Sequence, residues 1–205
     1  MLDPIAARVA ALLKRSADAS RYAKFVLIGL GLLALVGWGL FLNYYMPSYS
    51  VVQITDTDVK RMDDNNDIVT SKNPATMAGT RDVWFIMAND NDSRALIFRN
   101  EDTGWGFPWY FKFDSGDLTA EATRIRTRTP DAWVRVTHYG WRIHILSMFP
   151  NAVSIKVVDG PDHATIPWFN IVTLLLLHGV PGYGVWRLVR RVRRGRGGSE
   201  AAVAG

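Results

Sequence analysis

Residues 25–45 read FVLIGLGLLALVGWGLFLNYY, and residues 166–188 read IPWFNIVTLLLLHGVPGYGVWRL. About 20 helical residues, each rising about 1.5 Å, span the roughly 30 Å hydrocarbon layer of a bilayer. Both apolar runs are long enough to do so. We therefore expect a membrane protein in which transmembrane helices at 25–46 and 166–188 flank a separate, water-facing domain at 47–165.

Basic residues gather in the two tails outside these runs, at 1–24 and 189–205. Because Lys and Arg close to spanning helices stay on the cytoplasmic side, we expect both tails in the cytoplasm and the central domain exported. Nucleic acid is not an expected partner, since this charge lies beside the membrane and not on a folded face with stacking groups. Contact with anionic lipid headgroups is expected from Arg8, Lys14, Arg15, Arg190, Arg191, Arg193 and Arg194.

The amino-terminal tail predicts an amphipathic helix, with Pro4 in its first turn and Ile5, Val9 and Leu12 on one face. A loosely helical tail that only orients the anchor is the open alternative. We expect the first apolar run to be a retained anchor and not a cleaved signal. It is longer than a typical signal core, and no small-x-small cleavage site follows it.

The central segment at 47–165 predicts a mostly β domain, β-rich within an α+β class. Short segments rich in β-branched and aromatic residues, separated by turn formers, predict strands at 50–55, 81–88, 94–99, 109–113, 132–139 and 152–158. Asp90-Asn91-Asp92 predicts a hairpin connection, and 118–126 predicts a short helix. The chain contains no cysteine, so this domain must fold on its core alone.

The densest run of aromatic residues in the domain lies at 99–114. Its adjacent Glu101 and Asp102 raise a glycosidase hypothesis, because that chemistry uses two carboxylates, but no second acidic partner is identifiable. We interpret the glycines of this run as bends that let aromatic side chains fill a core, namely Trp105, Trp109 and Phe111. An exposed aromatic recognition surface is the alternative.

A second cluster runs from Thr137 to His144. Its two histidines, His138 and His144, are six residues apart, which is not a helical metal spacing, and we expect no metal or cofactor. Gly140 predicts a turn or bulge after a strand. No nucleophile elbow, phosphate loop or cysteine nucleophile is present, so no catalytic residue is assigned. The two clusters supply the candidate ligand or partner contacts: Glu101, Asp102, Trp105, Trp109, His138, Tyr139, Trp141 and Arg142.

His178 is the ionisable residue placed well inside the second apolar run, where burying such a group is costly. It lies beside Pro181, which removes a helix hydrogen bond and predicts a kink. We expect the imidazole ring to bond a freed backbone carbonyl and to steady the bend. A ligand-binding or proton-handling role is the alternative.

Asp63, Asn65 and Asp67 have the spacing that opens a calcium-binding loop. The sharp turn of that loop requires glycine at its sixth position and a bidentate carboxylate at its twelfth, where this chain has Ile68 and Pro74. We therefore expect a solvated acidic loop.

Four segments resemble the signature segments of an uncharacterised bacterial inner-membrane family, domain of unknown function 1523: NEDTGWG at 100–106, YFKFD at 110–114, VTHYGWR at 136–142 and FPNAVSIK at 149–156. The resemblance implies an inner-membrane protein. In such a protein the central domain, which the basic tails place on the outer side, is expected in the periplasm. It implies no activity, cofactor or catalytic residue.

The resulting functional expectation is an accessory, assembly or scaffolding protein that displays its β domain for contacts with other envelope proteins. The alternative is a membrane-anchored binding module for a small apolar or lipid-like ligand, held by the aromatic residues at 105–113. A hydrolase is a third hypothesis, for which Glu101, Asp102 and His138 are the residues to mutate.

Overall fold

The computed structural model of the chain describes residues 4–63, 68–69 and 79–203, and its side chains over 22–63, 68–69 and 79–191. The chain divides into two units, 1–45 and 46–205, which we describe separately.

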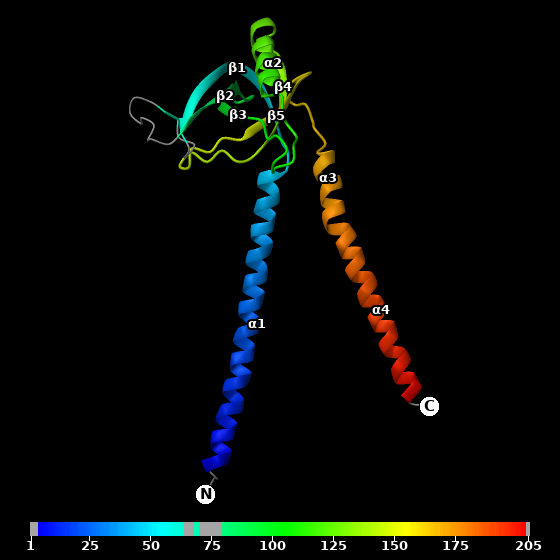
Figure 1. The fold of residues 1–205 in the computed structure, drawn as a ribbon. Coiled ribbons are helices and arrows are strands. Elements are labelled where there is room, and N and C mark those ends of the chain that lie inside the picture. The colour runs from blue at the N-terminus through cyan, green and yellow to red at the C-terminus, as the bar shows by residue number, and fades with distance from the viewer. Residues whose placement is uncertain (1–3, 64–67, 70–78, 204–205) are drawn as a thin grey trace. The chain divides into compact units, whose positions relative to one another are not determined.

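The first unit is one helix, α1 (Pro4–Tyr45), in which the expected amphipathic segment and the first apolar run are continuous (Figure 1). Its segment Tyr22–Tyr45 has a mean hydropathy of 2.5, and its apolar side chains are exposed. The run contains no proline before Pro47, so nothing interrupts the helical hydrogen bonds. By length and composition, this helix is able to cross a membrane.

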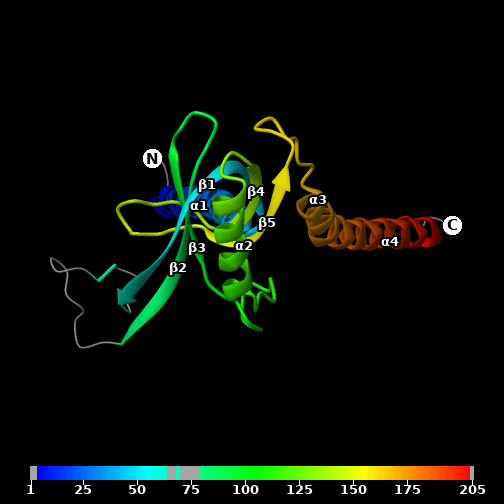
Figure 2. The same cartoon turned by 90° about the horizontal axis from the view of Figure 1, so that it is seen from above.

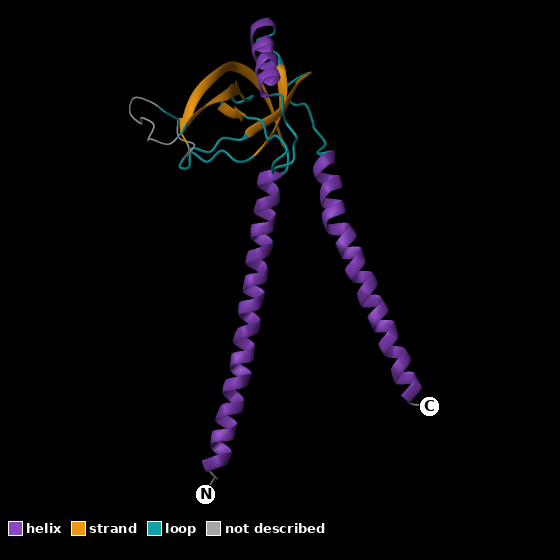
Figure 3. Ribbon diagram, viewed as in Figure 1, coloured by secondary structure: helices purple, strands orange, loops and turns teal. Residues whose placement is uncertain are grey.

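The second unit begins with a barrel of five strands and one helix. These elements are β1 (Ser48–Asp63), β2 (Thr80–Asn89), β3 (Ala95–Asn100), α2 (Ser115–Arg128), β4 (Trp133–Tyr139) and β5 (Asn151–Val158). The strands, which are orange in Figure 3, close into a barrel in the order β1-β2-β3-β5-β4. A five-stranded barrel in this order, with its helix inserted between β3 and β4, has the topology of the OB-fold.

The long strand β1 closes the barrel because it pairs with two neighbours. Its first half pairs antiparallel with β4, from Ser48 to Gln53, and its second half pairs with β2, from Gln53 to Asp63. A register shift between Ile54 and Asp56 bends the strand between these halves. The sequence predicted a strand at 50–55 only, and the structure extends it through the bend.

The barrel interior is filled with side chains. α2 lies over the strands (Figure 2) and contributes three buried residues, Leu118, Ala122 and Ile125. They pack against inward-facing residues of the strands, which are Val52, Ile54, Ile86, Ala88, Phe98, Val134, Val136 and Ala152. The domain therefore has a packed core without cysteine.

A second, smaller cluster covers the opposite face of β2. Neighbouring residues of a strand point to opposite faces, so Phe85 faces away from the interior that Ile86 enters. Met62 and Val83 pack with Phe85, and Phe149 meets the Phe85 ring edge-on with centroids 5.1 Å apart. The loop that carries Phe149 therefore covers this face of β2.

The carboxyl-terminal part of the unit is a second long helix. It consists of α3 (Trp168–Leu174), a π-helical turn (Leu175–Gly179) and α4 (Val180–Val203). The segment Trp168–Arg191 has a mean hydropathy of 1.3, and it too is able to cross a membrane by length and composition. Nδ1 of His178 lies 3.1 Å from the carbonyl oxygen of Leu174, so this ring contacts the backbone of its own helix one turn earlier.

Most predicted elements of the domain are present, including the hairpin connection at Asp90, whose carboxylate accepts the N–H groups of Asp92 and Arg94. The predicted strand at 109–113 is wrong, because this segment is a loop in which Phe111 has φ +50°. The possible calcium loop lies mostly outside the described residues, at 64–67 and 70–78.

Candidate functional site

The two clusters predicted from the sequence, at 99–114 and 137–144, lie at the same end of the barrel, which we call the loop end. Arg99, near the end of β3, pairs with Asn151 at the start of β5, and Tyr139 at the end of β4 pairs with the same asparagine. The connections 101–114 and 140–150 therefore leave the barrel at the same end, which is its lower edge in Figure 1.

The second apolar helix joins the molecule at the loop end. β1 starts there, because Ser48 pairs with His138 near the end of β4. Pro47 immediately precedes this strand, and its carbonyl oxygen accepts a hydrogen bond from Nδ2 of Asn170 in α3 at 2.9 Å. The start of the second apolar helix is thus held beside the loop end.

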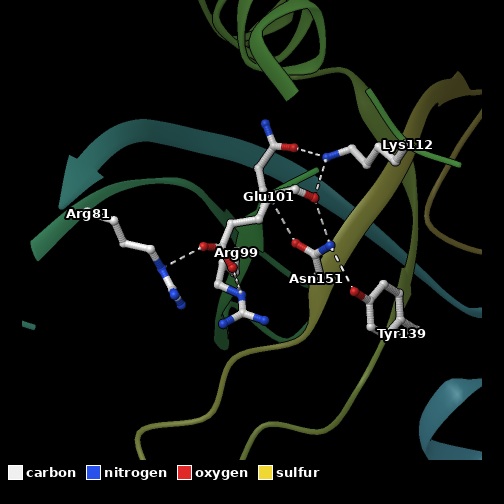
Figure 4. A network of polar contacts seen from close by, with 7 residues as sticks. Arg81, Arg99, Glu101, Lys112, Tyr139 and Asn151 are labelled. Atoms are coloured by element: carbon white, nitrogen blue, oxygen red, sulfur yellow. Dashed lines mark hydrogen bonds and ion pairs between the residues drawn. The ribbon is translucent and has the colours of Figure 1, made fainter. Parts of the chain in front are cut away.

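A buried lysine forms the centre of the loop end. The ammonium of Lys112 donates to Oδ1 of Asn100 and, at 3.4 Å, to the carbonyl oxygen of Glu101 (Figure 4). Nδ2 of Asn100 donates in turn to Thr119 Oγ1 and to the carbonyl oxygen of Ser115, both at 2.7 Å. Lys112 is only 4% exposed, and this burial lowers its pKa to about 8, against the nearby acidic groups that raise it.

Glu101 is part of the same framework. Its backbone N–H donates to Oδ1 of Asn151 at 2.9 Å, and its carbonyl oxygen accepts from Nδ2 of Asn151 at 3.0 Å. Its carboxylate lies 3.2 Å from Nε of Arg81 and 2.7 Å from Nε of Arg99 (Figure 4). A carboxylate shared by two arginines serves as a structural brace between β2 and β3.

The connection 101–114 is closed at its neck. The N–H groups of Thr103 and Gly104 donate to the carbonyl oxygen of Lys112, at 3.1 and 3.0 Å, and the N–H of Lys112 donates back to Thr103 Oγ1. Asp102 accepts the first N–H of α2, from Ser115, at 2.9 Å. Such an anion at a helix start is favourable, and it fixes the far end of the loop.

Five aromatic side chains project outward from this closed loop. They are between 51% and 79% exposed and form the aromatic surface, which consists of Trp105, Phe107, Trp109, Phe111 and Phe113. The rings contact one another, with centroids 5.2 to 5.7 Å apart. The interpretation that these aromatics fill a core is therefore wrong, because the loop turns alternate side chains outward.

Two even-numbered residues of the same stretch, Tyr110 and Lys112, face the barrel. Tyr110 stacks on Tyr139 with ring centroids 4.8 Å apart and planes 10° apart, and burial raises the pKa of its phenol. Lys112 is the other inward residue. The sequence shows this alternation, since every second residue from 105 to 113 is aromatic, and its last part predicted the strand at 109–113.

The connection 140–150 is a small hairpin with an apolar tip. Ile143 and Met148 form an isolated antiparallel bridge, and the guanidinium of Arg142 donates to the carbonyl oxygen of Met148 at 2.8 Å. The same guanidinium lies 4.0 Å from the centroid of the Phe149 ring. At the tip, Ile145 is 95% exposed and Leu146 is 60% exposed. Trp141 is half-buried, and Gly140 has φ +89°, which confirms the predicted turn.

His138 lies in the wall of the barrel. Its Nε2 is 2.9 Å from Ser50 Oγ, and its ring centroid is 5.1 Å from that of Phe98. Burial lowers its pKa to about 4, so the ring is neutral at pH 7. A serine–histidine pair needs a third group to orient the histidine, yet Nδ1 is buried without a hydrogen-bond partner among the described residues. The carboxylates of Glu101 and Asp102 are bound elsewhere.

A separate groove lies at the opposite end of the barrel, where β4 begins and β5 ends. Its volume is about 280 Å³, and we call it the α2 groove; it is lined by Arg124, Ile125, Arg128, Thr129, Ala132 and Val157. Arg124 is bound to Glu121 at 2.8 Å, whereas Arg128 has no ion pair with a described residue. Nothing in the sequence indicated this groove, because its lining comes from three separate elements.

The protein is thus a barrel of OB topology between two apolar helices in the sequence. Its loops expose aromatic and aliphatic side chains. The chain belongs to the family described as protein of unknown function (DUF1523), whose sequence model matches residues 22–193. It is similar to a protein of Haemophilus influenzae described as an uncharacterized protein, with 41% identity over 136 residues, covering 65% of this chain and 76% of that protein. No solved structure matches the chain.

Proposed function

We propose that the chain is an inner-membrane scaffolding protein that docks a segment of another envelope protein in the α2 groove. Both apolar helices cross the membrane, the basic tails lie in the cytoplasm against anionic lipid, and the barrel stands in the periplasm. The length and hydropathy of the helices and the arginine-rich flanks support this topology.

The interior of the domain favours surface contact over an enclosed ligand. The barrel is filled by its own side chains, and the aromatic surface points outward instead of around a cavity. OB-folds commonly bind oligonucleotides or oligosaccharides on the face of β2 and β3. Here Phe149 and Ile68 pack over that face, against Phe85, Met62 and Ile97. This arrangement weighs against both the small-ligand alternative and nucleic acid.

The α2 groove is the observation that carries the proposal. Its floor contains Ile125 and Ala132, and Val157 at its edge is 58% exposed. Arg128 adds a cation without an ion pair among the described residues. An apolar floor beside a free guanidinium fits a peptide segment that combines an apolar side chain with a carboxylate, since guanidinium binds carboxylate in a bidentate manner.

A photo-crosslinking amino acid at Val157 is expected to give a discrete adduct with a second protein in intact membranes. The matched control is the same substitution at Val59, a valine of β1 that is 43% exposed and lies outside the groove. Adding Arg128→Glu should abolish the adduct, because it replaces attraction by repulsion. Adducts with lipid or with the chain itself only, or an adduct that survives Arg128→Glu, would reject the docking role.

A further inference from the structure

We infer that the loop end of the barrel is seated in the outer leaflet of the same membrane, through the aromatic surface and the hairpin tip at Ile145 and Leu146. This inference rests on the membrane insertion of the proposed function and is independent of the α2 groove.

Position is the first argument. The connections 101–114 and 140–150 leave the barrel end at which β1 starts. Asn170 is the third residue of α3, and its side chain is hydrogen-bonded to the backbone of Pro47 at that same end. If α3 enters the bilayer at Trp168, both connections face the membrane surface, because the barrel end that carries them is held to the entry point of the helix.

Composition is the second argument. Between Thr103 and Phe113 the sole charged residue is Lys112, whose ammonium is buried. The exposed side chains of this stretch include two tryptophans and three phenylalanines, and aromatic rings of this kind settle where the headgroups meet the acyl chains. The hairpin tip adds two exposed aliphatic side chains, Ile145 and Leu146. Between Thr103 and Phe113 no charged side chain is exposed, and such an apolar stretch fits this boundary.

Rigidity is the third argument. The neck bonds between Thr103 and Lys112, the stacking of Tyr110 on Tyr139, and the clamp of Arg142 on the hairpin hold both connections in one conformation. A surface that is already ordered loses little conformational entropy when it binds. The bonds of buried Lys112 to Asn100 and Glu101, which we call the buried lysine network, fix the same connection. They therefore help to keep its aromatic rings exposed instead of packed into the barrel.

A protein partner would bury such a patch as well, but it would leave the position of the patch unexplained. Interfaces between proteins also use aromatic residues, which a polar rim surrounds. The exposed members of the aromatic surface are all hydrocarbon-rich, and they occupy the barrel end from which the second apolar helix departs. Lipid is the occupant that accounts for both observations.

The test uses the full chain, which lacks cysteine, in proteoliposomes of phosphatidylethanolamine and phosphatidylglycerol. A polarity-sensitive fluorophore is attached to Phe107→Cys or Ile145→Cys, one in each connection, and to Val157→Cys as the exposed control in the α2 groove. A nitroxide carried near the headgroup end of the lipid acyl chain serves as the quencher.

Several-fold stronger quenching at both loop positions than at Val157→Cys is the expected result. Water-exposed emission without quenching at both positions would overturn the inference, because the surface would then be free. Emission shielded from water but not quenched by lipid would also overturn it, in favour of a protein or a second copy. The crosslink at Val157 would be unaffected by either failure, so the two proposals are separable.

Discussion

Asn100→Ala is expected to lower the free energy of unfolding by about 3 kcal/mol, because it leaves a buried ammonium without its closest hydrogen-bond acceptor. Asn100 is fully buried and accepts a hydrogen bond from the Lys112 ammonium, which is still largely protonated at pH 7. The substitution also frees Thr119 and Ser115 from Nδ2. Thermal unfolding of the full chain in detergent micelles should show a midpoint lower by about 10 °C or more.

The double variant Asn100→Ala/Lys112→Met identifies the cause of this loss. If the uncompensated charge is responsible, removing it should restore most of the stability, because the remaining defect is a small cavity. Asn91→Ala, in the exposed turn between β2 and β3, is the matched control and should change stability by less than about 0.5 kcal/mol. Equal stability of Asn100→Ala and the parent would contradict the role assigned to the buried lysine network.

Acidification from pH 6.5 to pH 4 should lower the free energy of unfolding by up to about 3 kcal/mol through His138 alone. Burial lowers the pKa of His138 from its ordinary value of 6.5 to about 4 in the folded chain. The unfolded chain therefore binds more protons than the folded chain in this interval. The stability that depends on neutral His138 is fully present above pH 6.5 and is lost as the pH falls toward 4.

His138→Gln isolates this contribution from the carboxylates, which titrate in all variants. The variant should unfold with a shallower dependence on pH between 6.5 and 4 than the parent. His144→Gln is the matched control, since His144 is exposed on the hairpin, and its profile should match that of the parent. Identical profiles for His138→Gln and the parent would show that the ring is accessible to protons in the folded state.

The sequence predicted the elements better than their arrangement. Alternating and β-branched segments located β2, β3, β4 and β5 within a residue or two, because these strands have one buried face. The same alternation misled at 109–113, since an extended loop also turns every second side chain outward. The closing pair between Arg99 and Asn151 is long-range, and no local pattern indicates it.

In the candidate site, too, residues that share a local pattern could be predicted, whereas residues that depend on the fold could not. Glu101, Asp102, Trp105 and Trp109 were identified by their density in one stretch, and the structure places them at one end of the barrel. Lys112 was missed, because a lysine is usually a surface residue and its buried state depends on the surrounding fold.

Contacts across the barrel could not be predicted either, because they join residues far apart in the sequence. Asn151 binds the backbone of Glu101 from 50 residues away, and Ser50 meets His138 across 88 residues. A hydrogen bond of His138 in or near a sheet is expected from the sequence, but its partner, Ser50, becomes evident only in the fold.

The account depends most on the claim that both apolar helices cross the membrane and leave the barrel outside. Because the chain has no cysteine, single variants Asn91→Cys, Ser16→Cys and Ser199→Cys report one position each. A membrane-impermeant maleimide added to sealed spheroplasts should label Asn91→Cys, and should label the two tail variants only after permeabilisation. Labelling of the tails in sealed cells with protection of Asn91→Cys would contradict the account.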